Sequence, residues 1–384
     1  MRSIQIVSLI LTGLILAQPV AAAELTIERL VASPSLDGPS TDEVKFSPDG
    51  KRVTFLQGKA DNFEQQDLWE YNIADRERRL LVDSKSLLPG EEELSEVERA
   101  RRERQRIYAS GIIEYFWAPD SDALLFPLGG DIYYLPLGGE ARRLTETGTF
   151  ETDIKFSPRG NYVSFIRERD LYLIELSSGK ETRLTTDGGG VIGNGVAEFA
   201  AQEEMDRDTG YWWAPDESRI AYARIDESPV KVFERYELAA AGVKVVKQRY
   251  PYAGTKNVLI RLGVIAVTGG PTVWMDLGEE TDIYLARVDW LPGSKTLAIQ
   301  RQSRDQKRLD LLFADASRGA AVTVLTETSE TWLNLSHDLY FLDGSDQFLW
   351  TSEGSGYRHI YLYDNDGTLA RQVTSGDWVV SDIE

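Results

Sequence analysis

The sequence predicts an all-β fold, a β-propeller of four-stranded blades, and three observations lead to this prediction. A strand–turn–strand pattern recurs along the chain, in copies that open on Phe or Trp. The chain holds 9 Trp and 17 Tyr, residue types that favour strands. The turns carry their own signal, because Pro presets φ and Gly supplies a positive φ in segments such as SPDG at residues 47–50.

The copies start at uneven intervals along the chain. Each reads as a strand, a tight turn, a strand that alternates apolar and polar residues, and a further strand. Repeats of about 40 to 50 residues with several strands each are typical of blades stacked around an axis. We count about five to six blades and expect the surplus residues to form two short helical insertions. The copies open at Phe46, Trp117, Phe156, Trp213, Trp290 and Phe341.

The N-terminus reads as a targeting segment. Arg2 gives a positive start, residues 4–17 are apolar, and residues 21–23 are three alanines that suit cleavage after Ala23. The apolar run is short for a membrane span. We therefore expect a signal peptide at residues 1–23, an incomplete propeller domain at residues 24–384, and a periplasmic or secreted protein with no membrane attachment after cleavage.

Composition narrows the ligand classes. The chain carries 62 acidic and 42 basic residues, a formal net charge of -20, which disfavours nucleic acid and anionic lipid as partners and mildly favours cationic ligands. The chain has no Cys, so it has no disulfide framework. No acidic spacing resembles a Ca²⁺ loop and no His spacing resembles a zinc site, so we expect neither a metal nor a cofactor.

The first insertion, at residues 88–111, reads LPGEEELSEVERARRERQRIYASG. Ser95 followed by Glu98 predicts a capping box at the start of a helix. Acidic residues come first and arginines last, which suits the helix dipole. The helix is either a solvated surface helix or a source of guanidinium groups, among them Arg104 and Arg106, for a ligand carbonyl or carboxylate.

The second insertion reads NGVAEFAAQEEMDRDTGYWW from residue 194 to residue 213. Its part at residues 196–205 has a helical composition, and Glu203 and Glu204 lie next to each other in it. Adjacent helical side chains splay by about 100 degrees, so the two carboxylates can hold one cation between them, an ammonium being the obvious candidate. The alternative is a solvent-facing acidic turn. The position of the pair, in a break of the repeat, favours a binding role.

These segments resemble the N-terminal part of the dipeptidyl peptidase IV family, in the prolyl oligopeptidase group of serine peptidases, and most of all its exported bacterial members. The resemblance covers nearly the whole mature chain. The glutamate segment together with the arginine arm is specific, whereas the SPDG and RLT repeats also fit unrelated propellers. The matching segments are EFAAQEEMDRDTGYWWAPDESRIAYARIDESPV, ARRERQRI, LWEYNI, LPGEE, RYPYAG, YLARVDW, RQSRDQK and SGYRHIYLYD.

The resemblance implies an eight-bladed propeller that caps a C-terminal α/β-hydrolase domain, with a possible homodimer. It implies that Glu203 and Glu204 bind the free amino terminus of a peptide substrate. An arginine of the arm, Arg104 or Arg106, would contact a substrate carbonyl. Trp332 would lie in the segment that lines the far side of the substrate.

The chain departs from the family in its chemistry. A hydrolase of this kind needs a Ser on a G-x-S-x-G turn, an Asp and a His, and the sequence has no G-x-S-x-G. It has two histidines, His337 and His359, and we expect each to be a packed or surface residue rather than a catalytic one. We therefore assign no catalytic residue, expect the chain alone to be inactive, and expect the catalytic domain to lie beyond Glu384.

Two functions remain open from the sequence. The chain is either the substrate-gating, N-terminus-anchoring propeller of an exported serine dipeptidyl peptidase that releases X-Pro or X-Ala dipeptides, or a stand-alone exported propeller that binds peptides or a partner protein. An in-frame continuation with two further blades and a G-x-S-x-G would favour the peptidase. A cooperative, monomeric melt of a chain with a native stop would favour the binder.

Overall fold

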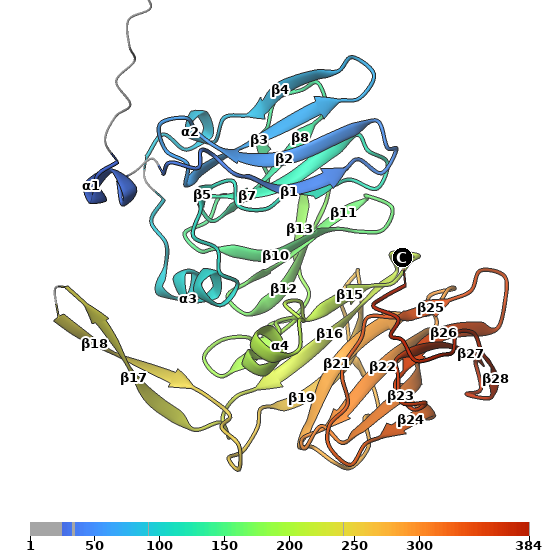
Figure 1. Cartoon of the computed structure of the whole chain (residues 1–384). Helices are drawn as coiled ribbons and strands as arrows, with labels where there is room; N and C mark the ends of the chain where they lie inside the picture. Colours follow the sequence, from blue (N-terminus) through green and yellow to red (C-terminus); the bar gives the residue numbers. More distant parts are fainter. Residues whose placement is uncertain (1–24, 33–34, 91, 241, 384) are drawn as a thin grey trace, which may run out of the picture.

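Six antiparallel sheets of four or five strands follow one another along the chain, and Figure 1 shows them succeeding each other around an arc. This computed structural model describes residues 25–383 except 33–34, 91 and 241. Each sheet is one blade, so the predicted all-β propeller of about five to six blades, with two short helical insertions, is confirmed. The signal peptide expected at residues 1–23 lies outside the described residues.

The first three blades have the simple up-and-down order. Strand β5 (Ser110–Gly111) adds to blade one by pairing in parallel with β3. Blade one holds β1 (Thr41–Phe46), β2 (Arg52–Gly58), β3 (Gln65–Asn72) and β4 (Glu77–Val82); blade two holds β6 (Phe116–Trp117), β7 (Ala123–Leu128), β8 (Asp131–Pro136) and β9 (Arg142–Arg143); blade three holds β10 (Glu151–Phe156), β11 (Tyr162–Arg167), β12 (Asp170–Glu175) and β13 (Lys180–Arg183).

Blade four departs from this order, and blades five and six return to it. Blade four holds β14 (Ile192–Asn194), β15 (Tyr211–Trp213), β16 (Arg219–Asp226), β19 (Leu259–Ala266) and β20 (Val273–Trp274); blade five holds β21 (Ile283–Trp290), β22 (Thr296–Ser303), β23 (Arg308–Asp315) and β24 (Ala321–Thr328); blade six holds β25 (Leu339–Phe341), β26 (Gln347–Ser352), β27 (His359–Asp364) and β28 (Leu369–Gln372). The helices among the described residues are α1 (Ile27–Leu30), α2 (Ser84–Leu87), α3 (Glu96–Arg104) and α4 (Phe199–Glu204).

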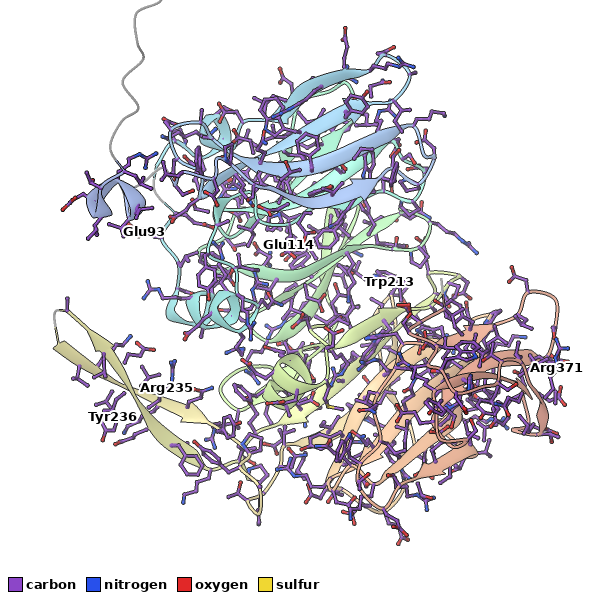
Figure 2. The ribbon with its side chains drawn as sticks, viewed as in Figure 1. Glu93, Glu114, Trp213, Arg235, Tyr236 and Arg371 are labelled. Carbon is purple, nitrogen blue, oxygen red and sulfur yellow. The ribbon has the colours of Figure 1, made fainter. Side chains whose placement is uncertain are left out.

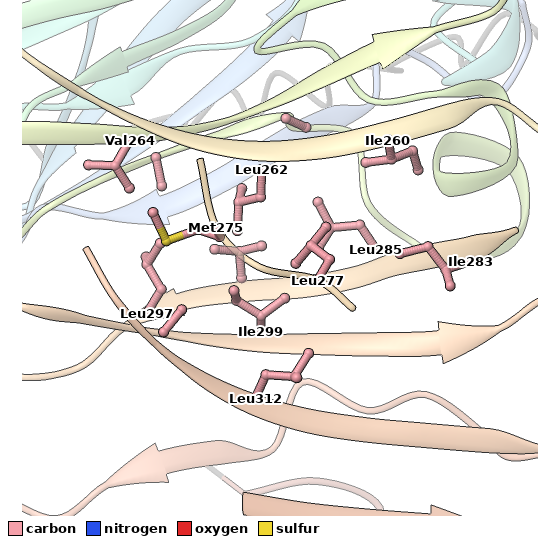
Figure 3. Packing of buried hydrophobic residues seen from close by; sticks show 14 of the residues in the cluster. Ile260, Leu262, Val264, Met275, Leu277, Ile283, Leu285, Leu297, Ile299 and Leu312 are labelled. Atoms are coloured by element: carbon pink, nitrogen blue, oxygen red, sulfur yellow. The ribbon is translucent and has the colours of Figure 1, made fainter. Parts of the chain in front are cut away.

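The hydrophobic core lies between neighbouring blades. Figure 3 shows side chains of β19 in blade four packed against those of β21, β22 and β23 in blade five. Leu262, Leu285, Leu297 and Ile299 in this cluster are fully buried. Burying a side chain of this size contributes about 1.5 to 3 kcal/mol. The packing therefore fixes blade five against the blade that carries α4.

Three turns use a side chain where the repeat elsewhere has glycine. Ser121, Glu217 and Ser294 take left-handed φ values of 65, 61 and 61 degrees, a backbone conformation that costs about 1 to 3 kcal/mol outside glycine. Each side chain accepts a hydrogen bond from the turn of the preceding blade. Ser121 Oγ binds the Asp49 N–H at 2.9 Å, Ser294 Oγ binds the Asp216 N–H at 3.0 Å, and the Glu217 carboxylate binds a blade-three N–H at 2.7 Å. The strained positions thus join adjacent blades.

A two-stranded hairpin leaves the body of the molecule between β16 and β19. It consists of β17 (Val232–Ala239) and β18 (Gly242–Arg249), which pair only with each other. Figure 2 shows Arg235 and Tyr236 on this hairpin, away from the blades, and Arg371 on the opposite edge of the molecule. Arg235 reaches Glu103 of α3 at 3.4 Å. The repeat pattern of the sequence does not predict this hairpin.

Helix α3 confirms the helix predicted inside residues 88–111, but half of its predicted capping box is wrong. Ser95 Oγ accepts a hydrogen bond from the Glu98 N–H at 3.1 Å, as expected of an N-cap. The Glu98 carboxylate, however, binds Arg101 at 2.7 Å and Arg102 at 2.8 Å. Two charged guanidinium groups are stronger partners than a neutral N–H, and they hold this carboxylate on the helix.

Helix α4 is shorter than the helix expected at residues 196–205. It begins at Phe199 because Glu198, its N-cap, has an extended backbone with φ -72 and ψ 163 degrees. The Glu198 side chain makes no cap hydrogen bond.

None of the helices that the structure describes has the length and apolar character needed to span a membrane.

Candidate functional site

Helix α4 interrupts the inner strand of blade four. Strands β14 and β15 both pair with β16, β14 opposite its end (Arg224 to Asp226) and β15 opposite its start (Ile220 to Tyr222). β14 and β15 therefore together occupy the place of a single strand beside β16. The chain between them, residues 195–210, leaves the sheet and contains α4. A rigid sheet on both sides of an excursion is the setting in which binding residues are usually found.

Glu203 and Glu204 are the last two residues of α4, and both are exposed. The opposite face is fixed to the body, because Ala200 and Met205 pack with the buried Tyr284 of blade five. No ion pair or side-chain hydrogen bond within the described residues engages either glutamate. The C-terminal end of a helix also carries partial negative charge. The arrangement therefore presents two free carboxylates, side by side, to a cation.

The arginine arm meets the glutamate helix. Arg104 Nε donates a hydrogen bond to Gln202 Oε1 at 2.7 Å, although the two residues are 98 positions apart. Burial lowers the pKa of the Arg104 guanidinium and repulsion from Arg101 adds to this, whereas attraction by Glu203 opposes it. An arginine stays charged in spite of such a shift. The charged Arg104 guanidinium thus lies near Glu203, but it forms no ion pair with either glutamate among the described residues.

Arg106 takes a different position. It follows the end of α3 with a left-handed φ of 56 degrees, and its side chain is exposed. Its backbone N–H donates to Glu103 O at 3.2 Å, but its guanidinium makes no hydrogen bond or ion pair with a described residue. The structure therefore brings Arg104 to the glutamates and leaves Arg106 facing solvent.

The remaining inner arginines of α3 hold the helix in place. Arg102 is buried and binds Glu92 at 2.7 Å and Glu98 at 2.8 Å. Arg101 binds Glu98 and approaches Glu114 at 4.0 Å. These pairs fix the direction in which α3 delivers Arg104, so the arm is not an ordinary solvated surface helix.

A cavity of about 630 Å³ lies between the inner strands of blades two to five, and Thr209, near the end of the α4 excursion, is part of its lining. Its wall is mostly aromatic and proline side chains, with Lys155 and Asp289 as its charged groups. Burial lowers the pKa of Lys155, although Asp153 opposes the shift. Burial raises the pKa of Asp289, and Arg287 and His337 oppose that shift. Trp213, labelled in Figure 2, belongs to this wall.

Neither histidine belongs to the glutamate site, and Trp332 lies on the surface. His359 is buried in β27, where its ring binds Thr374 Oγ1 at 3.1 Å and Gly376 O at 2.9 Å, so it is a packed structural residue as expected. His337 is a surface residue 3.4 Å from Asp206. Trp332 is 60% exposed, and its indole donates a hydrogen bond to Asn334 Oδ1 at 3.3 Å.

Two features of the site were missed from the sequence. Gln202 joins α4 to the arginine arm. In the sequence, the only indication of this role is that Gln202 directly precedes the glutamate pair. The charges at either end of the insertion, Glu198 and Arg207, form a buried ion pair at 2.6 Å. The sequence shows both charges, but only the folded chain shows that they are buried together.

A family model described as "Dipeptidyl peptidase IV (DPP IV) N-terminal region" matches residues 149–384, more than half of the chain. Relatives include a probable dipeptidyl peptidase 4 of Aspergillus flavus, 27% identical over 88% of this chain and 46% of its own length. A probable dipeptidyl peptidase 4 of Trichophyton verrucosum is 27% identical over 70% of this chain and 39% of its own. Mouse dipeptidyl peptidase 8 is 27% identical over 70% of this chain and 37% of its own. The chain thus spans less than half the length of each of these relatives.

Solved structures show the same fold. The crystal structure of Porphyromonas gingivalis dipeptidyl peptidase 4 superposes with a TM-score of 0.71 over 90% of this chain and 48% of that one, at 22% identity. A putative dipeptidyl aminopeptidase IV of Bacteroides ovatus gives a TM-score of 0.65 over 91% of this chain and 49% of that one, at 17% identity. From its repeated blades, its interrupted fourth blade and the family match, the chain belongs to the dipeptidyl peptidase IV N-terminal region family.

Proposed function

We propose that this propeller holds the free amino terminus of a peptide for a serine dipeptidyl peptidase. The observation that carries the proposal is the pair of exposed carboxylates, Glu203 and Glu204, at the end of α4, which have no partner in the part of the chain that the structure describes. An α-ammonium has three N–H donors and a positive charge, which two carboxylates can accept together. An N-blocked peptide lacks the charge and most of the donors, so the site discriminates against it.

Arg104 is the arm residue that we assign to the substrate. Its Nε is fixed by Gln202, and its other N–H groups have no partner among the described side chains. A guanidinium placed beside Glu203 can donate to the first peptide carbonyl of a chain whose amine lies on the glutamates. Arg106 is exposed and points to no group of the site, so we assign it no contact.

Cleavage in this proposal belongs to an α/β-hydrolase domain joined to the region. The propeller holds the amine at a fixed distance from the nucleophile, and that distance limits release to dipeptides, which we propose to be of the X-Pro or X-Ala kind. The names of the relatives, dipeptidyl peptidase 4 and 8, support the release of dipeptides. The propeller contributes binding and orientation, which lower the barrier by placing the reacting bond.

The test is the hydrolysis of a free-amine substrate by a protein that carries this region joined to its catalytic domain. Glu203→Gln and Glu204→Gln each remove one charge of the pair while keeping side-chain size. Losing one partner of a desolvated charge pair costs about 2 to 5 kcal/mol, so kcat/KM should fall about 30-fold or more. Unchanged kcat/KM in both variants would overturn the assignment.

For the homodimer we propose the hairpin β17–β18 as the contact surface. Its strands pair with no other sheet, and an isolated two-stranded hairpin is marginally stable in water. Its free edges can pair with a second chain. Its exposed apolar side chains include Tyr236, Leu238, Val243 and Val245. A second copy of the chain would cover these groups and complete the pairing.

We also propose export to the periplasm or the exterior, on the signal-peptide pattern at residues 1–23. A second function, a stand-alone propeller that binds peptides without cleavage, uses the same glutamate pair. The two functions differ in one outcome: under the second, the natural protein that contains this region would bind free-amine peptides and leave them intact.

A further inference from the structure

The excursion that carries α4 is closed at its base by a buried ion pair. Glu198, directly before the helix, and Arg207, shortly after its end at Glu204, meet at 2.6 Å, with side chains 2% and 3% exposed. They lie on either side of the six residues of α4, and their contact sets the separation of the two ends of the excursion. The pair is therefore placed where it can set the orientation of the helix.

The three guanidinium nitrogens of Arg207 each donate a hydrogen bond to a different part of the chain. Nη2 donates to Glu198 Oε2 at 2.6 Å, Nη1 donates to Thr209 O at 2.8 Å, and Nε donates to Leu285 O at 3.1 Å. Leu285 belongs to β21 of blade five. One guanidinium thus joins the start of the excursion, its end and the neighbouring blade, which a lysine ammonium cannot do in this planar geometry.

The end of the excursion is joined to blade three as well. Thr209 Oγ1 donates to Asp153 Oδ2 at 2.7 Å, and Lys155 Nζ donates to Thr209 Oγ1 and to Tyr211 O, the latter at 2.9 Å. Asp153 and Lys155 lie on β10. The glutamate helix is therefore held from below by the blades on both sides of its own.

The outer end of α4 lacks comparable support. Gln202 contacts Arg104, but Glu203 and Glu204 have no partner among the described residues. The direction of their carboxylates therefore depends on how the helix is held below them, by the packing of Ala200 and Met205 on Tyr284 and by the ion pair at the base of the excursion. Their function needs that direction, because a two-carboxylate grip on one ammonium depends on where both groups point.

The ion pair is not the arrangement that stability alone would favour. Glu198 Oε1 is buried and has no hydrogen-bond partner among the described groups. Desolvating two charges is costly, and a well-packed apolar pair of similar volume is often equally stable or more so. What an apolar pair cannot supply is the fixed, directional fork of Arg207.

We propose that Glu198 and Arg207 are positioning residues, which orient the Glu203–Glu204 pair toward the amino terminus of the peptide. This inference rests on the proposed function of that pair. It assigns the preference for a free amine to four residues, two that touch the ammonium and two that hold them in place.

The experiment measures the Kd of the chain for Gly-Pro-Ala amide and for its N-acetyl form by titration calorimetry, and takes their ratio. The variants are Arg207→Lys, which keeps the charge, and the double variant Glu198→Leu/Arg207→Met, which replaces both charges by apolar side chains. The control is Arg301→Lys in blade five, where a guanidinium whose side chain is 18% exposed binds the buried Asp310 at 2.7 Å, away from α4. Thermal melts of every variant establish that it is folded.

The ratio should fall about threefold or more in both base variants and stay at the wild-type value in Arg301→Lys. An unchanged ratio in a folded base variant would overturn the positioning role. An equal fall in Arg301→Lys would also overturn it, because the effect would then follow general destabilisation. A wild-type chain without any preference for the free amine would instead refute the proposed function itself.

Discussion

Arg104 on α3 and Gln202 on α4 are joined by a 2.7 Å hydrogen bond that bridges 98 residues of sequence. The bond brings the arginine arm from blade one to the glutamate excursion of blade four. It creates a site with one guanidinium and two carboxylates from segments that are separate in the sequence. A peptide terminus has the complementary groups, an ammonium followed by a carbonyl.

The two arm arginines should differ in their effect on substrate binding. Arg104→Ala should raise KM for a free-amine peptide about tenfold, because a charge-assisted hydrogen bond to a carbonyl contributes about 1.5 kcal/mol. Arg106→Ala, the matched control on the same arm, should leave KM unchanged, because Arg106 is exposed and unpaired within the described residues. Steady-state kinetics of the protein with its catalytic domain measures both. Equal effects of the two substitutions would contradict the assignment.

The glutamates should act on the amine rather than on the fold. Both are exposed, so Glu203→Gln and Glu204→Gln should change the melting temperature by little, since exposed carboxylates contribute at most about 1 kcal/mol. The same substitutions should reduce hydrolysis of free-amine substrates strongly. A loss of activity that tracks a loss of folded protein, followed by circular dichroism, would argue against a binding role.

Glu114 gives the fold a pH dependence. Figure 2 shows its side chain among the strands of the first blades. Burial raises its pKa above the ordinary 4.5, with Asp153 and Glu98 adding to the shift and Arg101 opposing it. The folded state then binds this proton more tightly than the unfolded chain. The stability from this group is complete below pH 4.5 and is lost as the pH rises through the raised pKa.

Glu114→Gln should therefore melt at a higher temperature than the wild type at pH 8 and show no such gain at pH 4. The control is Glu146→Gln, which changes a carboxylate with an 84% exposed side chain and should behave alike at both pH values. Thermal melts in the two buffers measure the difference. A gain for Glu114→Gln that is larger at pH 4 would reverse the sign and refute the argument.

The hairpin should control the oligomeric state. Tyr236→Glu and Leu238→Glu introduce charge on side chains that are 64% and 82% exposed, and each should convert a dimer to a monomer in light scattering. Val322→Glu on β24, where the valine is 66% exposed, is the matched control and should leave the mass unchanged. A wild-type chain that is monomeric at all concentrations would refute the dimer proposal.

The blades could be predicted because their signals are local. The turn at residues 47–50 and the strands that follow it repeat in recognisable form, and the periodicity alone specifies strands. The positions of Ser121, Glu217 and Ser294 could not be predicted in this way. Their left-handed conformation is stabilised by a hydrogen bond to another blade, and the sequence of one turn does not reveal its neighbour.

The candidate site was predicted in part. Glu203, Glu204 and the arginine arm stand out from the repeat, but the sequence could not choose between Arg104 and Arg106, because that choice depends on where α3 ends relative to α4. Glu198 and Arg207 carried no separate signal, since charged residues are usually exposed. Their burial follows from the packing of blade five, which lies about 80 residues further along the chain in the case of Leu285.

The most direct measurement compares the affinity of the chain for Gly-Pro-Ala amide and its N-acetyl form, in the wild type and in the double variant Glu203→Gln/Glu204→Gln. Because the loss of one carboxylate of the pair costs about 2 kcal/mol or more, the wild type should prefer the free amine by about 30-fold or more. The double variant should bind both peptides equally, with an unchanged melting temperature. A preference for the free amine that persists in the double variant would contradict the central claim.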